Sequence, residues 1–230
     1  MSAQNDIQIQ SQTPSPTIED YLWLIFTLER DGEDVIGARL ADLLDVSAPT
    51  VTVTLKRMIR DGWVEMDAGK HIRLTPDGTE AAKTVLRRHM LVEWLLAEML
   101  NVPWSKLHHE AHQLEHYISE EVEDRLIRQL GNRPVCPHGN PIPGNEDFVK
   151  QWPSLLDAPL NTPLIIRRVH EHAESRLNLM NFLEEHNLLP GSRVIVLEKL
   201  PFNETITLET NGQTAVLGYR SARQVYAEVL

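Results

Sequence analysis

The chain has 230 residues and a formal net charge of −11, with 42% hydrophobic and 24% charged residues. This size and composition are typical of a folded protein with one large or two to three small domains. A membrane-spanning helix is excluded, because no run of about eighteen apolar residues occurs. The polar start MSAQNDIQIQSQTPSPT lacks the basic and apolar parts of a signal peptide. The single cysteine, Cys136, cannot form an internal disulfide, so we expect a cytoplasmic protein.

The charge is unevenly distributed along the chain. Residues 47–90 carry eight Lys/Arg against five Asp/Glu, whereas residues 91–230 carry twelve against nineteen. An acidic chain is a poor partner for nucleic acid, but a locally basic segment is compatible with DNA binding. The acidic remainder would suit a cation as a second ligand.

The first part of the chain has the pattern of a small helical domain with a β-hairpin. We expect a disordered tail over 1–17. A folded unit follows it and ends at Thr75–Gly78. Apolar spacing and stop signals predict helices over 18–30, 35–44 and 49–60, then strands over 63–66 and 71–74. Ser47 is suited to cap the third helix, and Pro49 to its first turn. The sequence therefore predicts a winged helix-turn-helix over 18–78.

The remaining chain predicts a helical region and then a β-domain. Helical periodicity covers 79–100 and about 105–130, giving a domain over 79–131, and the prolines of 132–160 are typical of a linker. Strand-like runs cover 163–169, 193–200, 204–210 and 214–219, with a helix near 175–186. Asn211-Gly212 is a strong hairpin signal. The predicted fold class is mainly α with small β, ending in a barrel-like domain over 161–230.

The third helix is the candidate DNA-recognition element. In a winged helix-turn-helix its N-terminal residues reach bases and phosphates in the major groove, and residues 47–54 offer small hydroxyls and free backbone N–H groups there. The candidate DNA contacts are Arg39, Ser47, Pro49, Thr50, Thr52, Lys56, Arg57, Arg60 and Lys70. His71, which follows Lys70 at the hairpin tip, is a further candidate. The alternative is a three-helix core domain whose hydroxyls are only solvated.

Histidines concentrate in the middle of the chain and indicate a metal site. Six of the ten fall within 89–138. His108, His112 and His116 are spaced i, i+4, i+8, so one helix face would carry all three. Glu115 lies beside them, and His89 and Glu93 form a further i, i+4 pair. Imidazole and carboxylate ligands suit Mn(II), Fe(II), Zn(II) or Co(II); the alternative is a polar or pH-sensitive helix face.

A second alternative is a metalloprotease. Residues 112–116 match the pattern H-x-x-E-H, in which two histidines bind zinc and the glutamate acts as general base. A five-residue pattern often occurs by chance, whereas the helix-turn-helix accounts for more of the chain. We therefore favour a protein that is not an enzyme, with a metal-binding protein that does not bind an operator as a further alternative.

Several ordered segments resemble one known family. They are TIEDYL (17–22), SAPTV (47–51), RDG (60–62), LTPDG (74–78), HHEAHQLEH (108–116) and HGNPIP (138–143). From Ile18 onward the chain resembles the diphtheria toxin repressor family of metal-dependent regulators (DtxR/MntR), in its long form with an SH3-like (FeoA-like) third domain. The resemblance implies a homodimeric transcriptional repressor of metal homeostasis genes that binds operator DNA when metal is bound. No membrane and no small organic ligand are expected as partners.

The resemblance also implies two metal sites. The primary site would use Asp20, His112, Glu115 and His116. The ancillary site would use His89, Glu93 and His108, completed from the third domain by Glu174, by Glu171 or by water. A metal between Asp20 and the dimerisation helices would fix the spacing of the two recognition helices, which must fit half-sites about 34–36 Å or a multiple apart.

The chain departs from both branches of the family at these positions. The toxin-repressor branch has Met in place of Asp20 and Cys in place of His112, whereas the manganese branch has Glu in place of His112 and a further Glu in place of Trp23. A site without sulfur favours Mn(II), then Fe(II), with other divalent metals able to substitute in vitro. Cys136 and His138 are interpreted as parts of a turn into the third domain and not as ligands.

Overall fold

The computed structural model describes residues 13–131, 133–148 and 152–230. They form two compact units, divided after Lys83 within helix α4 (Pro76–Met99). The predicted tail lies outside the described residues over 1–12, and the prediction is wrong at its end, because helix α1 (Pro16–Arg30) begins at Pro16. Proline suits this first turn, where its missing N–H would have no partner. No helix in the described ranges is long and apolar enough to span a membrane.

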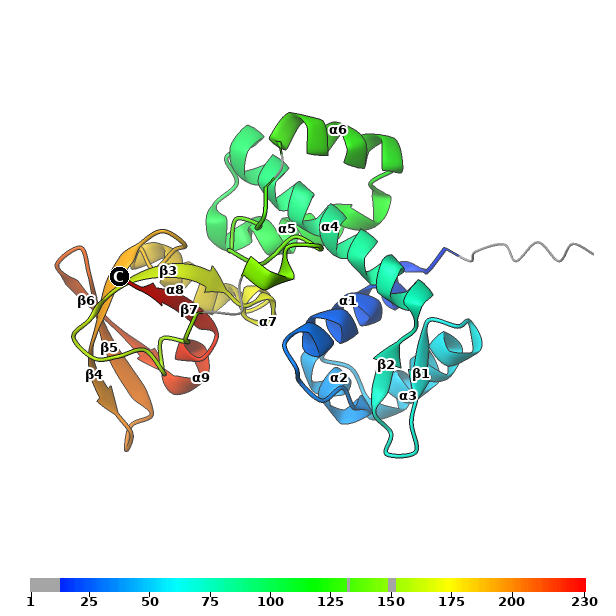
Figure 1. Ribbon diagram of the computed structural model, residues 1–230, viewed down its shortest axis with the longest axis horizontal. Helices are drawn as coiled ribbons and strands as arrows, with labels where there is room; N and C mark the ends of the chain where they lie inside the picture. The colour runs from blue at the N-terminus through cyan, green and yellow to red at the C-terminus, as the bar shows by residue number, and fades with distance from the viewer. Residues whose placement is uncertain (1–12, 132, 149–151) are drawn as a thin grey trace, which may run out of the picture. The chain divides into compact units, whose positions relative to one another are not determined.

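The first unit is the predicted winged helix-turn-helix. Helices α1, α2 (Gly37–Leu43) and α3 (Ala48–Arg60) precede an antiparallel hairpin of β1 (Val64–Met66) and β2 (Ile72–Leu74), whose tip projects beside α3 (Figure 1). The helices pack around fully buried apolar side chains, namely Leu22, Ile25, Leu28, Leu40 and Met58. The predicted cap is confirmed, because Ser47 Oγ accepts the backbone N–H of Thr50 at 3.3 Å.

The hairpin is followed directly by α4. Thr75 Oγ1 accepts the N–H of Gly78 at 3.0 Å, so Thr75–Gly78, predicted to close the unit, instead forms the start of this helix. A Cβ atom on Gly78 would lie 2.0 Å from the carbonyl oxygen of Trp63, so only glycine allows this close approach.

The predicted continuous helix over 105–130 is wrong. The 3-10 helix η1 (Trp104–Lys106) leads into α5 (Leu107–Leu114), which tightens into a second 3-10 helix, η2 (Glu115–Tyr117). The backbone is extended at Ile118, and Ser119 caps a new helix, α6 (Glu120–Leu130). No glycine or proline marks this break. At Glu115–Tyr117 the backbone hydrogen bonds instead join residues three apart, as in a 3-10 helix, and no longer residues four apart.

The Pro-rich region is also more ordered than a linker. Within 133–148, which includes the 3-10 helix η3 (Glu146–Phe148), the side chains of Cys136, His138 and Asn140 are buried. The predicted turn is present: the N–H of Gly139 donates to the carbonyl of Cys136 at 2.9 Å, with φ of +86° at Gly139. Residues 136–142 are therefore largely buried in the second unit, residues 143–148 are half-buried or exposed, and Asn132 and residues 149–151 lie outside the described residues.

A five-stranded antiparallel sheet completes the second unit, in the order β6-β5-β4-β3-β7. The predicted strands are confirmed, and a fifth, β7, was not predicted; the bounds are β3 (Pro163–Val169), β4 (Arg193–Leu200), β5 (Thr205–Thr210), β6 (Gln213–Gly218) and β7 (Val225–Val229). Irregular registers in β3 and β4 bend the sheet around its apolar core. The short helices α7 (Glu171–Glu174), α8 (Leu177–Glu185) and α9 (Tyr219–Ala222) connect these strands.

Replacement of Gly139 by Ala tests how firmly residues 134–142 are packed. The new Cβ would lie 1.9 Å from the carbonyl oxygen of Arg167, at a backbone conformation that disfavours side chains. We expect the variant to lose about 2–5 kcal/mol of unfolding free energy in urea. Gly144→Ala is the control, because its φ is +98° but no atom lies within 4 Å of the added Cβ. Equal losses for the two variants would contradict close packing at Gly139.

Candidate metal centres and nucleic-acid interface

The N-terminal half of α3 presents a row of small polar side chains. Thr52 Oγ1 donates to the carbonyl of Ala48 at 2.9 Å, and the hydroxyls of Ser47 and Thr50 are 2.8 Å apart. These bonds fix the side chains while their outer faces stay exposed. Val53 projects from the same helix with 69% of its surface exposed, an apolar contact suited to a thymine methyl group that the sequence did not single out.

The candidate cations differ in how far they are already neutralised. Arg60 Nε lies 2.7 Å from Asp61 Oδ1, and Arg57 Nε lies 3.6 Å from the other oxygen; the hydrogen bond from Arg60 lowers the pKa of Asp61. Both arginines stay more than half exposed, so a phosphate can still approach them. Arg39 is paired with Glu33 at 2.8 Å, and Lys70 occupies the hairpin turn with φ of +65°.

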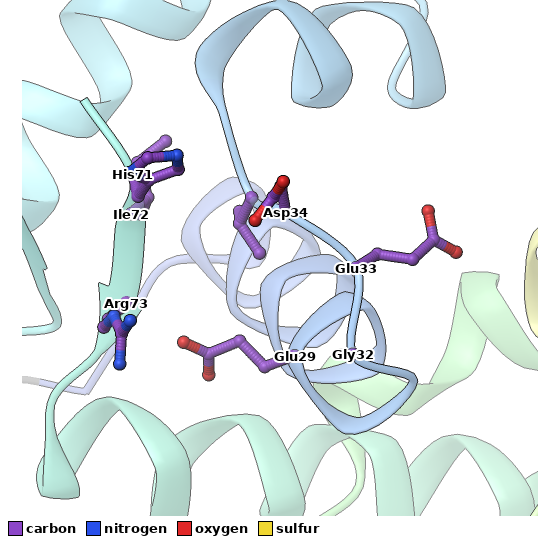
Figure 2. A pocket seen from close by; sticks show the side chains of 8 residues that line it. Glu29, Gly32, Glu33, Asp34, His71, Ile72 and Arg73 are labelled. Atoms are coloured by element: carbon purple, nitrogen blue, oxygen red, sulfur yellow. The ribbon is translucent and has the colours of Figure 1, made fainter. Parts of the chain in front are cut away.

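An open pocket of about 450 Å³ lies on another part of the first unit, between the α1–α2 connection and β2 (Figure 2). Glu29 and Asp34 lie on one side of it, and His71 and Arg73 lie on the other. Burial raises the pKa of Glu29, although the N–H of Leu74 donates to its carboxylate. The carboxylates of this pocket repel phosphate, so of its lining residues only His71, next to the hairpin turn, belongs to the candidate DNA surface.

The predicted ancillary residues meet within the second unit. His89 and Glu93 come from α4, His108 from α5 and Glu174 from α7, and their ligand atoms all lie within 4.8 Å of one another. His108 Nδ1 is 3.1 Å from His89 Nε2 and 3.0 Å from Glu174 Oε2, and His89 Nε2 is 3.2 Å from Glu93 Oε1. All four residues are buried. The sequence had assigned Glu174 to this set only through the family resemblance.

Neighbouring residues orient the carboxylate of Glu174. Asn140 Nδ2 donates to Glu174 Oε1 at 2.5 Å and to the carbonyl of Val169 at 2.8 Å. Arg168 Nε in turn donates to Asn140 Oδ1 at 2.5 Å. With Oε1 held in this way, Oε2 faces His108, as expected when outer partners orient a metal ligand.

Three of the predicted primary residues lie together at the end of α5. Glu115 Oε1 is 3.2 Å from His112 Nδ1 and 3.6 Å from His116 Nε2, and the second oxygen of Glu115 contacts His89 Nδ1. The two predicted sets are therefore joined through the Glu115–His89 contact. Asp20 lies on α1, in the first unit, and its convergence with the other three stays a prediction.

A further donor group includes residues that were interpreted only as a turn. Glu93, Cys136 and His138 are buried with their ligand atoms within 4.8 Å of one another. His138 Nδ1 is 3.0 Å from Glu93 Oε1 and 3.6 Å from Glu174 Oε1, and its Nε2 donates to the carbonyl of Trp104 at 3.2 Å. Metal-ligating histidines commonly donate their other N–H to a carbonyl in this way. The spacing Cys-Pro-His was visible in the sequence, but the partner Glu93 is 43 residues earlier.

Burial and charge act against each other in this cluster. Burial disfavours the imidazolium of His138, but the carboxylates of Glu174 and Glu93 outweigh it and raise the pKa to about 9. Burial likewise opposes ionisation of Glu115, but His89 and His112 lower its pKa to about 2. Glu93 Oε2 is buried without a hydrogen-bond partner among the residues that the structure describes. A buried carboxylate oxygen of this kind, among imidazole nitrogens, fits a divalent cation.

The raised pKa of His138 predicts how the metal-free protein depends on pH. Since this pKa lies above the ordinary value of 6.5, the His138 imidazolium stabilises the folded state. This stabilisation is complete below pH 6.5 and is lost as the pH rises through about 9. In the presence of a chelator, wild type should exceed His138→Gln in stability at pH 6. The difference should shrink toward pH 9.5 in urea unfolding. A gap that stays constant with pH would contradict the ionised imidazole.

Comparisons with known proteins agree with this arrangement. The family model described as "Iron dependent repressor, N-terminal DNA binding domain" matches residues 14–72. "Iron dependent repressor, metal binding and dimerisation domain" matches 75–144, and the FeoA domain matches 154–229. Together these models cover most of the chain in the order that the structure presents.

Whole-chain relatives extend the match. The iron-dependent repressor IdeR of Mycobacterium leprae is 34% identical over 223 residues, which cover 92% of this chain and 96% of that protein. The diphtheria toxin repressor of Corynebacterium diphtheriae is 34% identical over 210 residues, covering 87% and 92%. A solved manganese-dependent transcriptional repressor in complex with manganese superposes with a TM-score of 0.80 at 28% identity, covering 93% of this chain and 100% of that one. The chain therefore belongs to the diphtheria toxin repressor family of iron- and manganese-dependent repressors.

Proposed function

We propose that this protein is a transcriptional repressor that binds operator DNA as a homodimer when Mn(II) or Fe(II) occupies its His/Glu cluster. One observation carries the proposal: buried imidazole and carboxylate donors from α4, α5 and α7 converge in the unit that follows a winged helix-turn-helix. Family membership supports the same function, because relatives that match most of the chain are named iron-dependent repressor and diphtheria toxin repressor.

The donor chemistry supports Mn(II) ahead of Fe(II) as the physiological effector. Both proposed sites, Asp20 with His112, Glu115 and His116, and His89 with Glu93, His108 and Glu174, contain only nitrogen and oxygen donors. Burial raises the pKa of the Cys136 thiol, and the carboxylates of Glu93 and Glu174 add to this effect. A thiol that keeps its proton is a poor ligand, which reduces the preference of the neighbouring group for softer metals. Affinity order alone would favour zinc or copper, so metal availability must contribute to the choice.

The bound cation would supply positive charge to neutralise the carboxylates. Individual residues of the chain would link the two ligand sets and connect them to the DNA-binding unit. His89 contacts Glu115 as well as Glu93 and His108, so it links the two ligand sets. Asp20 would add a ligand from the DNA-binding unit, so that the DNA-competent arrangement binds metal more tightly than the metal-free one.

The protease alternative is disfavoured by the surroundings of Glu115. A general base needs an open position beside a zinc-bound water. The carboxylate of Glu115 is buried and already contacts His89, His112 and His116. These contacts support Glu115 as a metal ligand and not as a general base, so we propose no enzymatic activity.

DNA binding across a metal panel tests the function. A duplex selected from a random pool should bind at least about tenfold more tightly with Mn(II) or anaerobic Fe(II) than with chelator. Asp20→Asn and His116→Gln should abolish most of this gain, because each removes a primary ligand. His109→Gln is the matched control, since His109 is an exposed histidine of α5, the helix that directly precedes Glu115 and His116. Activation by zinc alone at buffered free concentrations would refute the metal assignment.

The recognition helix gives a separate prediction. Arg60→Ala should weaken binding to all duplexes and reduce the slope of log K against log salt by about 0.9, as loss of one phosphate contact does. Thr52→Val should weaken binding to the selected duplex more than to random DNA, because it removes a hydroxyl from the leading half of α3. Equal losses on both duplexes for Thr52→Val would remove this residue from base recognition.

A further inference from the structure

Glu184 of α8 caps a helix that lies far from it in the sequence. Its Oε1 accepts the backbone N–H of Trp104 at 2.9 Å, 80 residues earlier in the chain. Its Oε2 accepts the hydroxyl of Ser105 at 2.6 Å and the N–H of Ser105 at 3.4 Å. Pro103, the local residue at the N-cap of η1, provides no side-chain hydrogen bond. The carboxylate of Glu184 thus takes the place of a local cap.

This contact is strong for physical reasons. The first N–H groups of a helix have no partner within it, and the helix dipole favours a negative charge there. Hydrogen bonds to an ionised carboxylate are stronger than bonds between neutral groups. Ser105 is 3% exposed, so its hydroxyl would lose a partner that water cannot replace.

Both ends of the contact lead directly to metal-site residues. His108 follows Ser105 by one helical turn, at the start of α5. Glu174 ends α7, three residues before α8 begins at Leu177. Because η1 continues into α5 and α7 precedes α8, the Glu184 cap joins the two chain segments that carry His108 and Glu174, whose facing atoms are 3.0 Å apart.

Trp104 strengthens the same connection. Its indole packs against the hydrophobic core of the sheet and also against the core formed by α4 and α5. Its Nε1 donates to the carbonyl of Pro137 at 3.0 Å, and its own carbonyl accepts from His138. The element that Glu184 caps is therefore in contact with the core of α4 and α5, with the core of the sheet and with the segment that carries His138.

We propose that Glu184 is a positioning residue for the ancillary metal site: its cap on η1 holds α5 and α7 so that His108 and Glu174 face each other before an ion binds. This inference rests on the proposed metal-binding function. A site held in this way does not spend binding free energy on ordering its ligands. Replacement of the carboxylate by an amide keeps one oxygen acceptor but removes the charge that strengthens these hydrogen bonds, so it should weaken metal binding at this site by about five- to tenfold.

Mn(II) titration of the full chain tests the proposal, with free Mn(II) measured by electron paramagnetic resonance. His108→Gln identifies the ancillary class of ions as the class that it removes. Glu184→Gln should weaken that class and leave the other unchanged, whereas Glu185→Gln, an exposed neighbour on the same helix, should change neither. Hydrogen exchange in chelator should show faster exchange at the amides of Trp104 and Ser105 in Glu184→Gln only. Adding Ser105→Ala to Glu184→Gln should weaken binding of the ancillary class of ions little further, since both substitutions disrupt the same contact between Ser105 and Glu184.

The possible failures are distinguishable. If His108→Gln removes an ion but Glu184→Gln binds as wild type, the positioning role is refuted while the metal site stands. If Glu184→Gln weakens both classes equally and lowers the unfolding temperature, the residue only supports the fold, and the proposal is again overturned. If His108→Gln removes no ion, the proposed ancillary site itself is wrong.

Discussion

The buried carboxylates of Glu93, Glu115 and Glu174 are the constraint on which the second unit depends. An ionised carboxylate away from water costs several kcal/mol unless other groups compensate its charge. Here the compensation comes from imidazoles on α4, α5 and the 134–142 segment, which brings elements distant in sequence together. Protons on the histidines or a bound divalent cation can each compensate the negative charge of the carboxylates. Folding and metal binding therefore depend on the same carboxylates.

Sharing of donor residues between neighbouring groups follows from this crowding. Glu93 belongs both to the set with His89, His108 and Glu174 and to the group with Cys136 and His138. Glu115 contacts His89, so the primary and ancillary sets also have a common boundary. Substitution of a shared residue therefore disturbs more than one set, whereas His108 and His112 each belong to one.

Much of this arrangement could be predicted from the sequence where the signal was local. Apolar periodicity and caps predicted α1 to α3 and the hairpin, and i, i+4 spacing selected His89, Glu93 and His108. The break at Glu115–Tyr117 was missed because no helix-breaking residue marks it. The order of residues 134–142 was missed because proline content predicts a linker, whereas the burial of His138 depends on contacts with Glu93 and Trp104, more than thirty residues away.

The packing of Trp104 affects what can be learned from a shortened form of this protein. A chain ending before β3 would lack Glu174, but it would also lack the sheet core that covers one side of the indole. The exposed ring and the uncapped first turn would then promote association of the fragments through a surface that is absent in the full protein. Reduced metal response in such a fragment would combine the missing carboxylate of Glu174 with a damaged helical region, and only point variants separate the two.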